Sequence, residues 1–75
     1  MADGPGGVDW SSMIFDLLRN GHDVVTIATA TRSAKSTVKD WKQNTNAPRF
    51  EAGDALVSLW CEVTGKSRDS VPRLR

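Results

Sequence analysis

Apolar side chains recur every three to four residues in four short segments of this sequence, and polar or small residues separate the segments. The segments span residues 10–18, 24–31, 34–44 and 50–63. This spacing places the apolar side chains on one face of an α-helix, whereas a half-buried strand would alternate apolar and polar residues. The pattern predicts a small all-α domain of four helices, or five.

Within the third and fourth segments, the spacing also predicts which side chains face the core. The inner stripe of the third helix comprises Ala34, Val38 and Trp41. The inner stripe of the fourth helix comprises Phe50, Leu56, Leu59, Trp60 and Val63. We expect both stripes to pack against the first two helices.

Residues at the segment borders predict where each helix begins and ends. Short polar side chains accept hydrogen bonds from the first turn of a helix, proline suits that turn, and a glycine often follows the last one. The starting residues are Asp9, Asp23, Ser33 and Pro48. The ending residues are Asn20 with Gly21 and Thr64 with Gly65.

The two ends of the sequence differ from the helical segments in composition. Residues 1–8 read MADGPGGV, and glycine and proline in such a proportion hold neither a helix nor a strand. Residues 66–75 read KSRDSVPRLR. We therefore expect a disordered N-terminal tail over 1–8, one domain over 9–65 and a basic flexible tail over 66–75.

Several classes of function are disfavoured by what the sequence lacks. With 75 residues, the chain is too short to enclose a deep catalytic cleft. One cysteine and one histidine provide neither a disulfide nor a metal cluster, and the sequence has no glycine-rich phosphate loop. No apolar run approaches the length of a membrane span, and the first residues carry no signal pattern. We expect a cytoplasmic protein that is not an enzyme and needs no cofactor or metal.

Charge is distributed unevenly along the chain. Residues 32–49 hold five basic side chains and one acidic, whereas residues 1–31 hold one basic and four acidic. A basic middle is typical of a surface that meets a polyanion, and it is equally typical of a solvated helix face that serves solubility. Charge alone does not decide between these two interpretations.

The segment HDVVTIATATRSAKSTVKDW resembles the helix-turn-helix of the Cro and phage-repressor superfamily. Ile27 and Ala28 match the buried pair of its first helix, and Val38 and Trp41 match the two core positions of its recognition helix. The following APRFEAGDALVSLW is similar to the helix that packs behind this motif, and KSTVKDWKQ is also similar to lambdoid activator relatives. Arg32 stands where the family has glycine, and a left-handed arginine there costs roughly 1 kcal/mol relative to glycine.

The resemblance implies a lambda-repressor-like fold in which the helix around 34–44 enters the major groove of double-stranded DNA. The residues that it implies for base contacts are Ala34, Lys35, Ser36, Lys39 and Asp40. The residues that it implies for phosphate contacts are Arg32, Thr37, Lys42, Asn44, Asn46 and Arg49. Lysine donates to guanine, serine bonds to several base edges, and aspartate accepts from the cytosine amino group.

A module of this size covers little DNA, so we expect a homodimer on a two-fold operator. The candidate dimer surface lies on the fourth helix, at Val57, Trp60 and Cys61, on the condition that Val57 and Cys61 are exposed. The predicted function is a sequence-specific phage regulator that blocks RNA polymerase or recruits it.

Two alternatives remain open at this point. One is a phage packaging or accessory subunit that uses the same motif. The other is a protein-interaction module that docks on a host or phage protein through its tryptophans and acidic first helix. Independently of these alternatives, Trp10 is interpreted either as a lid on the core or as an anchor for a partner.

Overall fold

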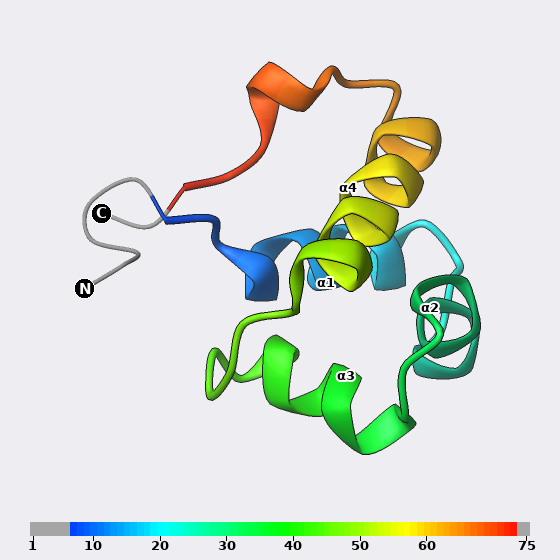
Figure 1. Ribbon diagram of the computed structural model, residues 1–75. Helices are drawn as coiled ribbons and strands as arrows, with labels where there is room; N and C mark the ends of the chain where they lie inside the picture. The colour runs from blue at the N-terminus through cyan, green and yellow to red at the C-terminus, as the bar shows by residue number, and fades with distance from the viewer. Residues whose placement is uncertain (1–6, 74–75) are drawn as a thin grey trace.

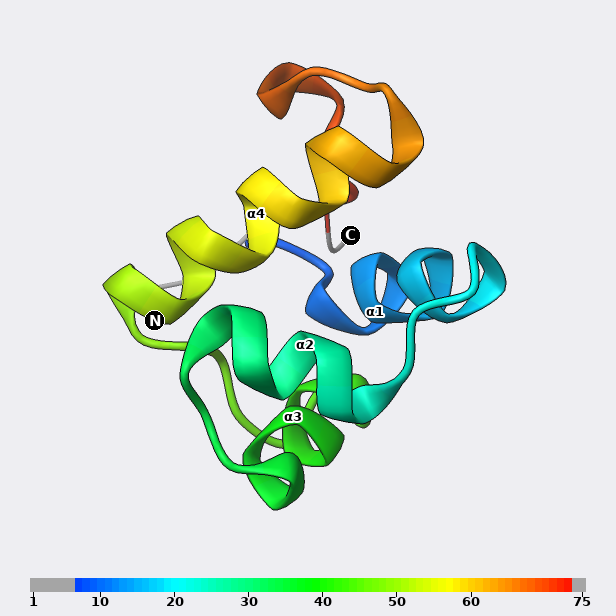
Figure 2. The ribbon, with the colours of Figure 1, turned by 90° about the vertical axis from the view of Figure 1, so that its right-hand side faces the viewer.

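The computed structural model describes residues 7–73 and is all-helical over that range. The helices are α1 (Trp10–Arg19), α2 (Val24–Thr31), α3 (Lys35–Lys42) and α4 (Phe50–Thr64), followed by one turn of 3₁₀ helix, η1 (Arg68–Ser70). In Figure 1, α3 lies along the lower edge of the molecule, with α4 above it. Figure 2 shows α2 between α4 and α3. The predicted small all-α domain of four helices is confirmed.

One apolar core holds the four helices together. Each of the four helices contributes fully buried side chains, and both α1 and α2 pack against α3 and α4. The buried core comprises Met13, Ile14, Leu17, Ile27, Ala28, Val38, Trp41, Leu56, Val57, Trp60 and Val71. The indole of Trp60 also donates from Nε1 to the Asp16 carboxylate at 3.0 Å, which joins α4 to α1.

The first two helices begin with the predicted caps. Asp9 accepts from the backbone N–H of Ser12 at 3.2 Å, and Asp23 accepts from the backbone N–H of Thr26 at 2.8 Å. The hydrogen bonds from the backbone and hydroxyl of Thr26 hold the pKa of the Asp23 carboxyl below its ordinary value, because they favour the charged form. Both caps satisfy backbone donors that the first helical turn leaves without a partner.

The third helix begins differently from the prediction. Its N-cap is Ala34, which makes no side-chain cap and is exposed rather than part of an inner stripe. The Ser33 hydroxyl instead donates to the carbonyl of Thr31 at 3.3 Å. The assignment of Ser33 as the cap and of Ala34 to the core was therefore wrong, because the turn after α2 consumes one more residue than the pattern suggested.

All four helices end at a residue with left-handed backbone conformation. After α1, Gly21 has φ +91° and its N–H reaches the carbonyl of Leu18 at 3.2 Å, while the N–H of His22 reaches that of Leu17 at 3.1 Å. This pair of bonds is a Schellman motif, and Arg32 (φ 56°) and Asn44 (φ 59°) close α2 and α3 in the same way. Gly65 (φ 74°) follows α4.

The start of α4 also departs from the prediction. The helix begins at Phe50 with Arg49 as its N-cap, so Pro48 precedes the helix instead of occupying its first turn. Phe50 is 87 % exposed and takes no part in the inner stripe. Closer to the core, Trp10 packs its ring on Gly53, where a Cβ would lie only 3.1 Å from the ring.

Residues 66–73 are folded onto the domain, so the prediction of a flexible tail from residue 66 was wrong over this range. Val71 is 7 % exposed and packs in the core, and Arg68 donates to Asp54 and to Ser58 on α4. An antiparallel bridge pairs Val8 with Arg73, and Val8 packs against the core, so the prediction of a disordered N-terminal tail was wrong at this residue. Residues 1–6 and 74–75, where the remaining predictions of disorder fall, lie outside the described residues.

Candidate nucleic-acid interface

The outward face of α3 carries four of the five side chains predicted to contact bases. Lys35, Ser36 and Lys39 are exposed and Asp40 is partly exposed, while Ala34, the fifth, is exposed at the N-cap. The face points outward because Val38 and Trp41, on the opposite side of this two-turn helix, are buried in the core. The structure thus brings the predicted base-contacting residues together on one accessible surface.

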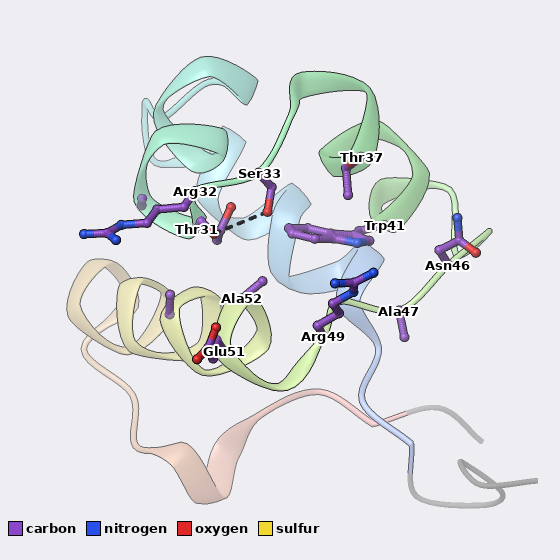
Figure 3. Close-up of a pocket in the computed structure, with 12 residues that line it drawn as sticks. Thr31, Arg32, Ser33, Thr37, Trp41, Asn46, Ala47, Arg49, Glu51 and Ala52 are labelled. Carbon is purple, nitrogen blue, oxygen red and sulfur yellow. Dashed lines mark hydrogen bonds between the residues drawn. The ribbon is translucent and has the colours of Figure 1, made fainter.

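A groove of about 910 Å³ runs along one edge of α3, between the turn after α2 and the first turns of α4. It is lined by Ala30, Thr31, Arg32, Ser33, Thr37, Trp41, Asn46, Ala47, Arg49, Glu51, Ala52 and Ala55. Figure 3 shows Arg49 beside the Trp41 ring, with Asn46 and Ala47 beyond it, and Arg32 on the other side of the groove with its guanidinium directed away from Trp41. The groove is formed by residues from four separate segments of the chain.

Four of the six residues predicted to contact phosphate line this groove. They are Arg32, Thr37, Asn46 and Arg49. Periodicity within α3 accounts for Thr37 alone, since the other three lie outside the helix. Arg32 reaches the groove from the turn after α2, and Asn46 and Arg49 reach it from the connection between α3 and α4, in which Asn44 has φ 59°.

The other two predicted phosphate contacts, Lys42 and Asn44, lie outside the groove. Lys42 is on the opposite edge of α3, where its ammonium lies over the ring of Phe15 at 5.6 Å from the centroid. Asn44 is exposed in the turn after α3. The sequence offered one signal for the Phe15 contact, because Phe15 falls outside the apolar spacing of its helix.

Among the described residues, the basic side chains around α3 form no ion pairs with carboxylates. Within residues 7–73, none of the five cations of the basic middle forms an ion pair; these are Arg32, Lys35, Lys39, Lys42 and Arg49. Two other arginines do pair: Arg19 with Asp16, and Arg68 with Asp54. Glu51 is the carboxylate that lines the groove. An anionic partner would therefore meet cations that have no competing carboxylate bond to break.

The candidate dimer surface on α4 is not available in this fold. Trp60 is 1 % exposed and Val57 is 8 % exposed, and Cys61 is partly buried beside them. The condition for that surface, exposure of Val57 and Cys61, is not met, because Val57 belongs to the buried core and Cys61 packs against that core. An interface through these residues would require the core to open.

Over 7–73, no three side chains of histidine, cysteine, aspartate or glutamate gather as a metal ion would require. None of the helices described is long and apolar enough to cross a bilayer.

Comparisons with protein-family models, with curated proteins and with solved structures found no match to this chain.

Proposed function

We propose that this protein is a sequence-specific DNA-binding transcriptional regulator in which α2 and α3 act as a helix-turn-helix. In this proposal α3 enters the major groove and α2 crosses the backbone beside it. The protein acts by occupying an operator and so blocking RNA polymerase or recruiting it. This function agrees with the resemblance of residues 23–63 to Cro and the phage repressors.

The observation that carries the proposal is the groove beside α3. Arg32 lines one side of this groove, and the guanidinium of Arg49, the hydroxyl of Thr37 and the amide of Asn46 lie around Trp41 on the other side. Arginine, hydroxyl and amide donors are the groups that proteins use to hold DNA phosphates. A strand seated there would fix the depth and orientation of α3 in the adjacent major groove.

The chemistry of the exposed α3 face supports base contacts next to those phosphate contacts. Lys35 and Lys39 can donate to O6 and N7 of guanine, Ser36 can donate or accept, and Asp40 can accept from N4 of cytosine. The small Ala34 at the N-cap allows close approach to a thymine methyl. A face that served only solubility would need no such mixture of donor and acceptor beside a phosphate groove.

The test is selection of bound duplexes from a randomised library at near-physiological salt, followed by sequencing. We expect an enriched motif, and a two-fold motif with half-sites about 10 base pairs apart would indicate a homodimer. A single enriched half-site would support DNA binding by a monomer, as expected of a packaging subunit. No enrichment by the folded protein would contradict the proposal.

Paired variants distinguish base contacts from general attraction of charge. Lys35→Ala with Ser36→Ala should abolish preference for the selected motif while circular dichroism stays unchanged, since both side chains are exposed. The matched control is Lys66→Ala with Ser67→Ala, which removes the same two side-chain types outside α3 and should leave the preference intact. Equal loss in both variants would mean that α3 does not read bases.

The alternative, a protein-interaction module, draws on a different observation. Phe50 is 87 % exposed at the start of α4, and an aromatic ring so open to water is a common anchor for a protein partner. Docking through tryptophans is disfavoured because Trp41 and Trp60 are buried and Trp10 lies against Gly53. Phe50→Ser should abolish binding to such a partner and should leave DNA binding unchanged.

A further inference from the structure

We infer that Phe15 is a positioning residue for DNA binding, because its ring holds the Lys42 ammonium in place to contact the second strand of the duplex. The inference rests on the proposed function and adds a residue from α1 to the interface. It starts from the contact between Lys42 Nζ and the Phe15 ring, at 5.6 Å from the centroid.

The two edges of α3 face different neighbours. At about 100° per residue, Ser36 lies roughly midway between Thr37 and Lys42 on the exposed half of the helix. Thr37 lines the groove with Arg32, whereas Lys42 faces α1 and Phe15. The face predicted to contact bases is therefore flanked by cationic side chains on both sides.

This arrangement matches the shape of a major groove. A helix in that groove, which is about 12 Å wide, has one sugar-phosphate strand on each side. If the strand on one side occupies the groove between Arg32 and Arg49, the strand on the other side passes the edge of α3 that carries Lys42. Lys42 is the cation on that edge whose side chain rests on a ring from another helix.

Phe15 can hold the Lys42 ammonium because its aromatic ring is partly exposed and carries a quadrupole that attracts a cation. The ring is 43 % exposed, so its substitution removes little of the core. A cation over an aromatic face is attracted to it, and the contact leaves the N–H donors that point away from the ring free to bond a phosphate. A long lysine side chain that is already confined loses less conformational entropy when the phosphate arrives.

The experiment is a double-mutant cycle on DNA affinity, measured by fluorescence anisotropy with a labelled duplex of the selected motif. Phe15→Leu keeps an apolar side chain and removes the quadrupole, Phe15→Trp keeps an aromatic face, and Lys42→Ala removes the cation. We expect Phe15→Leu to weaken binding by about two- to fivefold, the size of an exposed cation–π contact, and Phe15→Trp to restore it. In the Lys42→Ala background, Phe15→Leu should have no further effect.

A second measurement tests the geometry without DNA. The ε-methylene protons of Lys42 should show an upfield ring-current shift that Phe15→Leu abolishes, while the circular dichroism spectrum stays the same. Absence of that shift in the wild-type protein would overturn the inference. So would equal weakening by Phe15→Leu with and without Lys42, since that pattern denotes a structural effect.

The two proposals fail in different ways. Equal affinity of the wild type and Phe15→Leu for duplex DNA would overturn the role of Phe15 alone. Wild-type protein that binds no duplex overturns the proposed function and the role of Phe15 together.

Discussion

Replacing Arg32 with glycine should stabilise the fold and weaken DNA binding at the same time. Arg32 ends α2 with φ 56° and ψ 42°, a conformation that costs a residue with a Cβ about 1–2 kcal/mol. Glycine avoids that cost, although its greater freedom in the unfolded chain offsets about 0.5–1 kcal/mol. The side chain is exposed, so its loss removes no buried contact.

The expected net gain for Arg32→Gly is about 0.5–1 kcal/mol in the free energy of unfolding. For a domain of 60–100 residues, 1 kcal/mol shifts the melting temperature by about 4–8 °C, so the variant should melt about 2–8 °C above the wild type. Thermal and urea denaturation followed by circular dichroism measure this difference. A variant no more stable than the wild type would refute the argument from backbone strain.

The same variant should lower the salt dependence of DNA binding. Loss of one phosphate contact reduces the slope of log K against log salt concentration by about 0.9 in magnitude. Arg32→Lys is the matched control, because it keeps both the charge and the Cβ and should change neither the melting temperature nor the slope. An unchanged slope in Arg32→Gly would remove Arg32 from the proposed phosphate contacts.

Three further predictions concern the core, the C-terminal segment and a helix cap. Trp60→Phe deletes the hydrogen bond to Asp16 and part of a buried ring, so urea denaturation should show a loss of about 2 kcal/mol; a loss below about 0.5 kcal/mol would contradict the role of that bond. Truncation after Gly65 removes Val71 from the core and should cost about 2 kcal/mol, whereas an unchanged denaturation midpoint would show that the segment contributes nothing. Because the folded pKa of Asp23 lies below its unfolded value, the cap stabilises fully above about pH 4 and its contribution is lost as pH falls through the folded pKa. The difference in stability between the wild type and Asp23→Asn should therefore shrink in acid, and a difference independent of pH from 7 to 2 would refute this reasoning.

Features set by a few neighbouring residues were predictable from the sequence. Asp9 and Asp23 cap their helices, and Gly21 and Gly65 end theirs, because each of these contacts lies within one helical turn. The apolar stripes that contain Val38 and Leu56 were also predictable from the sequence, because burial of one helix face produces the three-to-four-residue spacing of apolar side chains.

Features that depend on distant parts of the chain were not predictable. Val71 is one apolar residue in a polar segment, and nothing local indicates that it is buried. Ser33 was misassigned because the left-handed Arg32 shifts the start of the next helix by one residue. The exposure of Phe50 has the same origin, since the start of α4 is set by the path of the preceding loop.

The candidate interface also combines residues that local spacing predicts with residues that distant segments bring together. The exposed face of α3 follows from its helical spacing, because that spacing places Lys35 and Lys39 on the surface opposite Val38. The groove required Asn46 and Arg49 to approach α2 and α3, which periodicity does not encode. The contact of Phe15 with Lys42 likewise depends on how α1 crosses α3.

The bridge between Val8 and Arg73 couples local unfolding of the segment before α1 to local unfolding of the segment after η1. Asp9 donates its backbone N–H to the carbonyl of Pro72 at 2.9 Å, and the side chain of the same aspartate caps α1. Residues that are distant in sequence thus belong to one unit of local unfolding, in the sense used for native-state hydrogen exchange. Release of residues 71–73 would expose the Asp9 amide to solvent and free the residue that caps the first turn of α1. The exchange rate of that single amide therefore reports how often the two ends of the domain separate.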